Sequence, residues 1–141
     1  MPSLRDVSDT YERYFKLEHG DVVVDVGATV GEFAIHAATQ VGEGGVVIAI
    51  EPEPRNFACL RYNVSSFNNV RLVNKAVTEI KMGKIRLYLD PLYMGGHSTK
   101  IPKYSFIEVP TDTLDNIMAS HGIRKVDFLK INCEGGNFKG G

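Results

Sequence analysis

Runs of apolar, mostly β-branched residues alternate along the chain with segments in which apolar residues recur at helical spacing. The apolar runs lie at residues 22–26, 45–50, 70–74 and 126–131. The segments with helical spacing lie at residues 33–41, 55–67 and 111–121. Strands buried on both faces of a parallel sheet read as continuous apolar runs, and amphipathic helices repeat every 3.6 residues. The alternation therefore predicts an α/β fold with a mostly parallel sheet, in which residues 126–131 pair with residues 22–26.

A different pattern interrupts this alternation in the middle of the chain. Residues 84–89 alternate polar and apolar side chains, which is typical of a half-exposed strand. We expect residues 76–80 to pair with them through a turn at residues 81–83, forming a β-hairpin insertion. Residues 90–103 then read as a loop, and residues 105–109 as another short strand.

The first apolar run leads into a turn that contains two glycines, Gly27 and Gly31. A strand, a glycine turn and a helix together present a ligand to backbone N–H groups and to the positive end of the helix. Dinucleotide sites favour the pattern G-x-G-x-x-G, but Ala28 and Thr29 stand where the middle glycine would be needed. The turn therefore disfavours a pyrophosphate and suits a smaller or less charged group. The alternative is a plain strand-to-helix turn without a ligand.

Three polar residues at the ends of predicted strands are candidates for binding a ligand. Asp25 lies inside a valine run, where burial costs several kcal/mol unless the carboxylate has a partner, either the turn backbone or a cationic ligand group. Glu51 ends the second run, beside the turn, where a carboxylate can accept hydrogen bonds from the two hydroxyls of a ribose; the alternative is a solvated loop carboxylate. Pro52 stiffens the backbone after it. Asn74 follows the third run and either meets an adenine edge or is a turn asparagine.

Four segments in this order resemble successive motifs of the class I S-adenosylmethionine (SAM)-dependent methyltransferases, most closely those of the FkbM type. They are VVVDVGATVGEF (22–33), IAIEPEPRNF (48–57), VNKAV (73–77) and VDFLKINCEG (126–135). The resemblance covers residues 20–136 and implies a Rossmann-like, doubly wound fold with SAM as the cofactor. It also implies that Asp25 supports the methionine end of the cofactor. The residues assigned to cofactor binding are Asp25, Gly27, Ala28, Thr29, Gly31, Glu51, Pro52, Asn74 and Ala76.

The resemblance weakens where the acceptor side of the family's site lies. The FkbM pattern there has an acidic residue, an apolar residue, and then Glu-Gly-Ala-Glu, whereas this chain has amides at Asn132 and Asn137. An amide cannot act as a base, so Glu134 is the better candidate for orienting an acceptor, with Asn132 beside it. His97, in the loop of residues 90–103, is a hypothetical general base; a surface histidine is the alternative.

The chain also stops early relative to the family. Class I methyltransferases have a seven-stranded sheet, and this chain ends just after the fourth core strand. We therefore expect one incomplete domain, residues 1–141, in which residues 126–131 form an exposed apolar edge. Either the chain is truncated, naturally or by cloning, or a homodimer covers this edge.

Composition narrows the classes of partner. A formal net charge of −1 without a basic block argues against a nucleic acid, and no apolar run approaches the roughly 20 residues of a membrane span. The mixed, polar amino terminus is not a secretory signal. Neither Cys59 nor Cys133 belongs to a C-x-x-C motif or lies near a histidine, which disfavours a metal site or a disulfide and favours a reducing cytoplasm.

Together these observations predict a SAM-dependent methyltransferase that transfers a methyl group to a hydroxyl oxygen of a small acceptor. Such a transfer is an in-line displacement that needs positioning more than acid–base chemistry, in keeping with the few acid–base candidates. A truncated SAM-binding module without turnover is the second hypothesis, favoured by the missing strands and the two amides. A nucleotide-dependent oxidoreductase is the third, disfavoured by the absent G-x-G-x-x-G.

Overall fold

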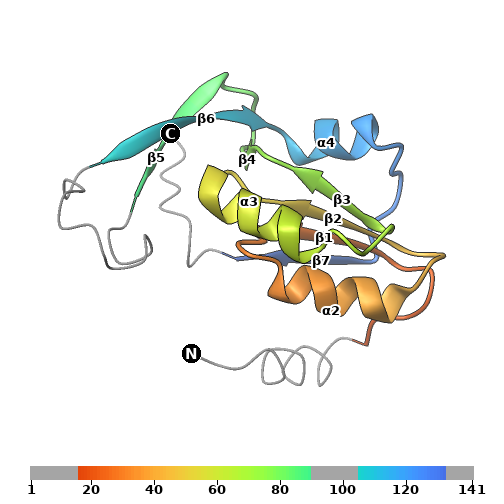
Figure 1. Ribbon diagram of the computed structural model, residues 1–141. Helices are drawn as coiled ribbons and strands as arrows, with labels where there is room; N and C mark the ends of the chain where they lie inside the picture. The colour runs from red at the N-terminus through yellow and green to blue at the C-terminus, as the bar shows by residue number, and fades with distance from the viewer. Residues whose placement is uncertain (1–15, 90–104, 133–141) are drawn as a thin grey trace.

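The main sheet has four parallel strands in the order β3-β2-β1-β7. The computed structural model, shown in Figure 1, describes residues 16–89 and 105–132 of the chain. The strands are β1 (Val22–Val26), β2 (Val46–Ile50), β3 (Val70–Val73) and β7 (Phe128–Ile131). The predicted parallel sheet is therefore confirmed, including the pairing of β7 with β1.

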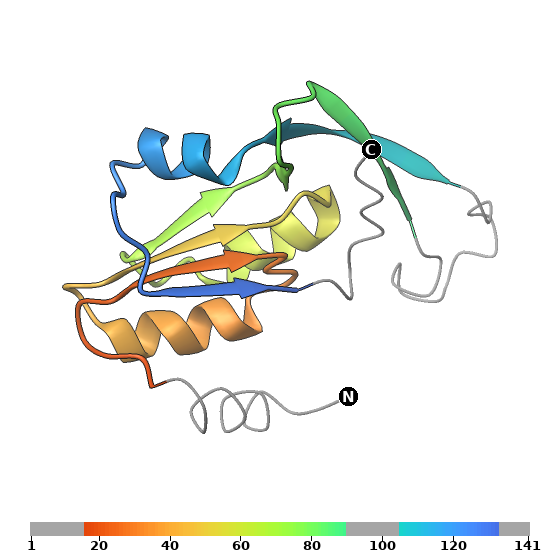
Figure 2. The ribbon, with the colours of Figure 1, turned by 180° about the vertical axis from the view of Figure 1, so that it is seen from behind.

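Within the described residues, three helices cover the two faces of this sheet, as a doubly wound fold requires. They are α2 (Glu32–Val41), α3 (Pro54–Asn63) and α4 (Leu114–Ser120). Helices α2 and α3 lie on one face and α4 lies on the other, as Figure 2 shows from behind. On the first face Phe33 and Leu60 pack with Val23, and on the second Ile117 packs among residues that include Ile48. The two central strands, β1 and β2, are buried on both faces, which explains their continuous apolar sequence.

A second, smaller sheet contains β4 (Ala76–Val77), β5 (Lys84–Tyr88) and β6 (Phe106–Asp112), in the order β4-β6-β5. It lies beyond the carboxyl ends of the four parallel strands (Figure 2). The predicted pairing of residues 76–80 with residues 84–89 is wrong, because β6 lies between β4 and β5 and pairs with both. An antiparallel pair is present, but it joins β5 to β6.

The reason for this exchange of partners is the alternating pattern of β6. In the observed register Ile85 faces Val109 and Leu87 faces Ile107, so four apolar side chains lie together. The residues after β4 offer no such match, because the chain turns at Thr78, whose hydroxyl donates a hydrogen bond to the Ile80 carbonyl oxygen. The matching of apolar side chains therefore favours the pairing of β5 with β6 over the pairing of β5 with the nearer residues 76–80.

Several predicted boundaries shift. Helix α3 ends at Asn63 rather than near Phe67, although Val64 and Phe67 still pack on the first core cluster. The predicted helix 111–121 loses its start to β6 and begins at Leu114, because Thr113 is the N-cap and its hydroxyl accepts a hydrogen bond from the Asn116 N–H. The predicted short strand 105–109 extends to Asp112.

Strand β7 is one of the two edge strands of the main sheet within the described residues, and β3 is the other (Figure 1). Its side chains Leu129 and Ile131 are 43% and 60% exposed, so the expected apolar edge is confirmed for this part of the chain. None of the helices in residues 16–89 and 105–132 combines the length and the apolar character needed to cross a membrane. The predicted loop from 90 onward, His97, Glu134 and Asn137 lie outside the described residues.

Candidate functional site

The glycine turn after β1 is held tightly against the end of β2. The N–H groups of Gly27 and Ala28 both donate to the carbonyl oxygen of Ile50, at 2.8 and 3.0 Å. The Gly31 N–H donates to the Ala28 carbonyl oxygen at 3.0 Å. Gly27 has a φ of +82°, and a Cβ built on it would lie 2.8 Å from the Asn132 carbonyl oxygen. Only glycine fits at this position without a shift of the backbone.

These hydrogen bonds also limit what the turn can bind. Because the N–H groups of Gly27, Ala28, Thr29 and Gly31 all donate within the protein, this turn has few amides to offer a phosphate. That observation agrees with the lack of a middle glycine and continues to disfavour a dinucleotide.

Glu51 joins the end of β2 to the glycine turn. One carboxylate oxygen, Oε1, accepts a hydrogen bond from the Thr29 N–H at 2.8 Å, and Oε2 accepts one from the Glu53 N–H at 3.0 Å. The residue is buried, and this burial raises the pKa of Glu51 against the lowering effect of the two backbone hydrogen bonds. Each oxygen keeps a further lone pair, so the carboxylate braces the turn and can still accept from a ligand.

Asn74 and its neighbours occupy the end of β3. The Asn74 Nδ2 donates to the backbone carbonyl oxygens of Glu51 and Pro52, at 2.8 and 3.2 Å. The side-chain amide of Asn74 therefore holds the Glu51–Pro52 backbone in place. The side-chain Oδ1 of Asn74 is the atom that could accept a hydrogen bond from a ligand. Pro52 is buried, and Ala76 is fully buried against Leu87 in the smaller sheet. The side chain of Ala76 is thus part of a core.

Asp25 is fully buried at the middle of the sheet. Within the described residues neither of its carboxylate oxygens has a hydrogen-bond partner. The glycine turn does not serve it, because those N–H groups donate to Ile50 and Glu51. Burial raises the pKa of Asp25 from its ordinary 3.8 to about 6; Lys130 opposes this rise and the nearby Glu51 adds to it.

Sequence reasoning missed Lys130, which is the cation facing Asp25. The parallel register of β1 and β7 sets Lys130 opposite Asp25, and its Nζ lies 4.0 Å from Asp25 Oδ1. The same Nζ lies 4.9 Å from the centre of the Phe33 ring on α2. A lysine inside an apolar strand run was the available signal. Its partner could be identified only from the register.

Asn132 is the predicted catalytic residue that the structure describes. It directly follows β7, where its N–H donates to the Val26 carbonyl oxygen at 2.9 Å. Its Nδ2 lies 3.5 Å from the Gly27 carbonyl oxygen. The end of β7 therefore faces the glycine turn, as predicted, whereas Glu134 and His97 lie outside the described residues.

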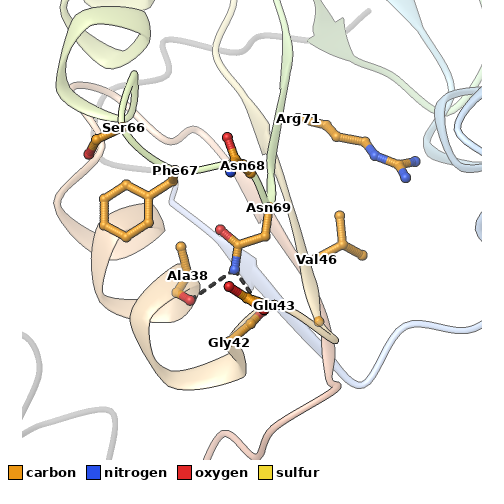
Figure 3. A pocket seen from close by; sticks show the side chains of 10 residues that line it. Ala38, Gly42, Glu43, Val46, Ser66, Phe67, Asn68, Asn69 and Arg71 are labelled. Carbon is orange, nitrogen blue, oxygen red and sulfur yellow. Dashed lines mark hydrogen bonds between the residues drawn. The ribbon is translucent and has the colours of Figure 1, made fainter.

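A surface hollow of about 540 Å³ lies at the opposite end of the sheet, near the start of β2 and β3 (Figure 3). Asn69 lines it, and its Nδ2 donates to the carbonyl oxygens of Ala38 and Gly42, which closes the carboxyl end of α2. Among the predicted site residues that the structure describes, none lines this hollow. Ligands of open α/β sheets bind at the carboxyl ends of the strands, so we assign the candidate site to the glycine turn.

Comparison with known proteins finds similarity to methyltransferases. The family model described as "Methyltransferase FkbM domain" matches residues 25–140. The 31-O-demethyl-FK506 methyltransferase FkbM of Streptomyces tacrolimicus is 28% identical over 151 residues, covering 84% of this chain and 57% of that protein. A probable cobalt-precorrin-6B C(15)-methyltransferase of Sulfolobus acidocaldarius is 34% identical over 83 residues, covering 57% and 43%.

Solved structures give the same kind of match. A SAM-dependent O-methyltransferase from Thermotoga maritima has a TM-score of 0.48 and 20% identity, and the match covers 57% of this chain and 38% of that one. The chain thus spans about half the length, or less, of the known proteins it matches.

Proposed function

The chain belongs to the FkbM methyltransferase family, whose methyl donor is SAM, and from this premise we propose that its glycine turn forms the SAM-binding part of an O-methyltransferase. The observation that carries the proposal is the pair of buried carboxylates near the turn: Asp25 lies within β1, and Glu51 directly follows the adjacent strand β2. SAM is a cation with a ribose, and its chemistry matches such a pair better than that of an anionic dinucleotide does.

The residues present fit the cofactor. Glu51 holds the turn with one hydrogen bond to each oxygen and keeps lone pairs for the two ribose hydroxyls. Asp25 has no exposed surface, so its charge acts on the ammonium of the methionine half across the turn. The electrostatic attraction between two separated charges is stronger in a low-dielectric protein interior than in water. Asn74 braces the Glu51–Pro52 backbone at the adenine side.

When bound, SAM supplies an activated methyl group on a positively charged sulfur. The protein then has to hold the acceptor oxygen in line with the methyl group and exclude competing geometries. In this proposal the turn and Glu51 fix the donor, while Asn132, at the end of β7, faces the acceptor side. Glu134 and His97 stay predictions for orienting the acceptor and taking its proton.

Titration calorimetry with SAM and with S-adenosylhomocysteine tests this proposal. The wild-type chain should bind each at one site, and Glu51→Gln should weaken both by about 10- to 100-fold, because each lost hydrogen bond to a charged group is worth about 1.5–3 kcal/mol. Glu43→Gln is the matched control, since Glu43 is exposed and lines the distant hollow. Circular dichroism confirms that each variant is folded.

Two results would overturn it. One is a folded wild-type chain that binds neither ligand at millimolar concentration. The other is a Glu51→Gln variant that binds both as tightly as the wild type does. Titration with NADH belongs to the same series, because saturable NADH binding would favour the oxidoreductase instead.

A SAM-binding module without turnover is the second candidate function. The amide at Asn132, in place of the family's carboxylate, favours it. Transfer of a radiolabelled methyl group to a panel of small hydroxylated acceptors separates the two candidates. Transfer by the wild-type chain supports the enzyme, and binding without transfer supports the module. We propose a small acceptor rather than a nucleic acid, since the net charge of −1 offers little attraction for phosphates.

We also propose that the protein is cytoplasmic and that a second copy of the chain covers the edge of β7. The exposed Leu129 and Ile131 on an edge strand support the pairing with a second copy. Light scattering over a range of concentrations tests it. A dimer that Leu129→Lys dissociates agrees with the proposal, and a monomer at high concentration contradicts it.

A further inference from the structure

Lys130 lies in a setting that is unusual for a lysine. Its side chain is only 15% exposed, and it belongs to a strand of the main sheet. Within the described residues, its ammonium group lies near the Phe33 ring, 4.9 Å from Nζ, and near the Asp25 carboxylate, 4.0 Å away. The Phe33 ring packs in turn on Phe128, with ring centres 5.8 Å apart. The ammonium is thus attracted both by the face of the Phe33 ring and by the Asp25 carboxylate.

Asp25 needs such a cation to stay charged. Burial and the nearby Glu51 both favour its neutral form, and Lys130 is the charge that opposes them. The helix packed on this side contributes Phe33 and, beside it, His36, whose ring centre lies 6.2 Å from that of Phe33. With the pKa of Asp25 at about 6, the carboxylate is ionised at neutral pH by a margin of only about one pH unit.

We propose that Lys130 is a positioning residue that keeps Asp25 ionised and so makes the glycine turn selective for ligands that carry an α-ammonium group. The proposal rests on the proposed function, because it assigns Asp25 to the methionine half of SAM. Lys130 itself acts through Asp25 and has no contact with the methyl group in this scheme. Replacing Lys130 should therefore weaken the binding of ligands that carry the amino-acid half, and it should do so mainly at low pH, where Asp25 becomes protonated.

The first experiment measures Asp25 directly and needs no ligand. The side-chain carboxyl carbon of Asp25 is titrated by NMR in the wild type, Lys130→Met and Lys130→Arg, with Asp25→Asn used to assign the signal. Removing an adjacent opposite charge should raise the pKa of Asp25 by about 1–2 units, and arginine should restore it. Lys125→Met is the matched control, because Lys125 pairs with Asp127 instead, at 3.0 Å, and is 80% exposed.

The second experiment compares S-adenosylhomocysteine, which has the amino-acid half, with 5′-methylthioadenosine, which lacks it. If the pKa of Asp25 rises from about 6 to about 7.5, Lys130→Met should bind S-adenosylhomocysteine about 15-fold more weakly than the wild type at pH 6. The deficit should fall to about fourfold at pH 7 and below about twofold at pH 8. Binding of 5′-methylthioadenosine should not change at any of these pH values, because it has no ammonium group.

The outcomes separate this inference from the proposed function. A wild-type chain that fails to bind S-adenosylhomocysteine contradicts the proposed function, and with it the selectivity assigned here. An Asp25 pKa that is the same in Lys130→Met and the wild type overturns the role of Lys130 even where the wild type binds. So does an equal loss of affinity for both ligands at every pH, which is the result of a purely structural role. If Lys130→Met does not fold, Lys130→Gln takes its place in both experiments.

Discussion

Replacing Asp25 by asparagine should change how the stability of this protein depends on pH. The pKa of Asp25 is raised from 3.8 in the unfolded chain to about 6 in the folded one, so the folded state binds a proton more tightly. The stabilisation this supplies is fully present below pH 3.8 and is lost as the pH rises through about 6. Over the whole range it amounts to about 3 kcal/mol, at 1.36 kcal/mol for each pKa unit.

Between about pH 4.5 and pH 7.5 the wild type should therefore lose about 2 kcal/mol of unfolding free energy through this one group. Asparagine does not titrate, so the variant lacks this loss. The free energy of unfolding of Asp25→Asn, minus that of the wild type, should therefore increase by about 2 kcal/mol from pH 4.5 to pH 7.5. Urea unfolding followed by circular dichroism at several pH values gives the difference, whatever constant cost the buried amide adds.

Asp127→Asn is the control with the opposite sign. Hydrogen bonds from the Val22 N–H and from Lys125 lower the pKa of Asp127, so its stabilisation is present above pH 3.8 and is lost as the pH falls through the lowered value. Its variant should lose most at neutral pH. A stability difference for Asp25→Asn that stays constant from pH 4.5 to 7.5 would refute the assignment of a raised pKa to Asp25.

Two further substitutions test the supports of the site. Gly27→Ala should lower the unfolding free energy by at least about 1–2 kcal/mol in thermal unfolding, because alanine is strained at φ +82° and its Cβ meets the Asn132 carbonyl oxygen. Gly83→Ala is the control and should cost less, because Gly83 has a similar φ of +77° but a Cβ there meets nothing within 4 Å. An equal loss of stability in the two variants would contradict the role of the Asn132 contact. Asp112→Asn should lower the Tm more at pH 7 than in acid, because Lys75, 3.1 Å from Oδ2, lowers the pKa of Asp112, and the stabilisation is lost as the pH falls through this lowered value. An equal drop in Tm at neutral and acidic pH would contradict this.

The glycine turn shows how far a local pattern reaches. The local sequence predicted the strands from the valine run, the turn from its two glycines, and the position of Glu51 at the carboxyl ends of the strands. These predictions succeeded because each feature depends on residues that are neighbours in the sequence. The predicted hairpin was wrong for the complementary reason. Alternation in residues 84–89 shows that a strand has two different faces, but it does not show which strand pairs with it.

The sequence by itself determined the alternating strands and helices, the position of the turn, and the presence of two acids near it. Those features follow from side-chain polarity and backbone preference within a few residues. Only the tertiary structure decided that Asp25 has no hydrogen bond from the turn and that Lys130 faces it at 4.0 Å. That pairing joins residues about a hundred positions apart, and it depends on the register in which β7 lies against β1.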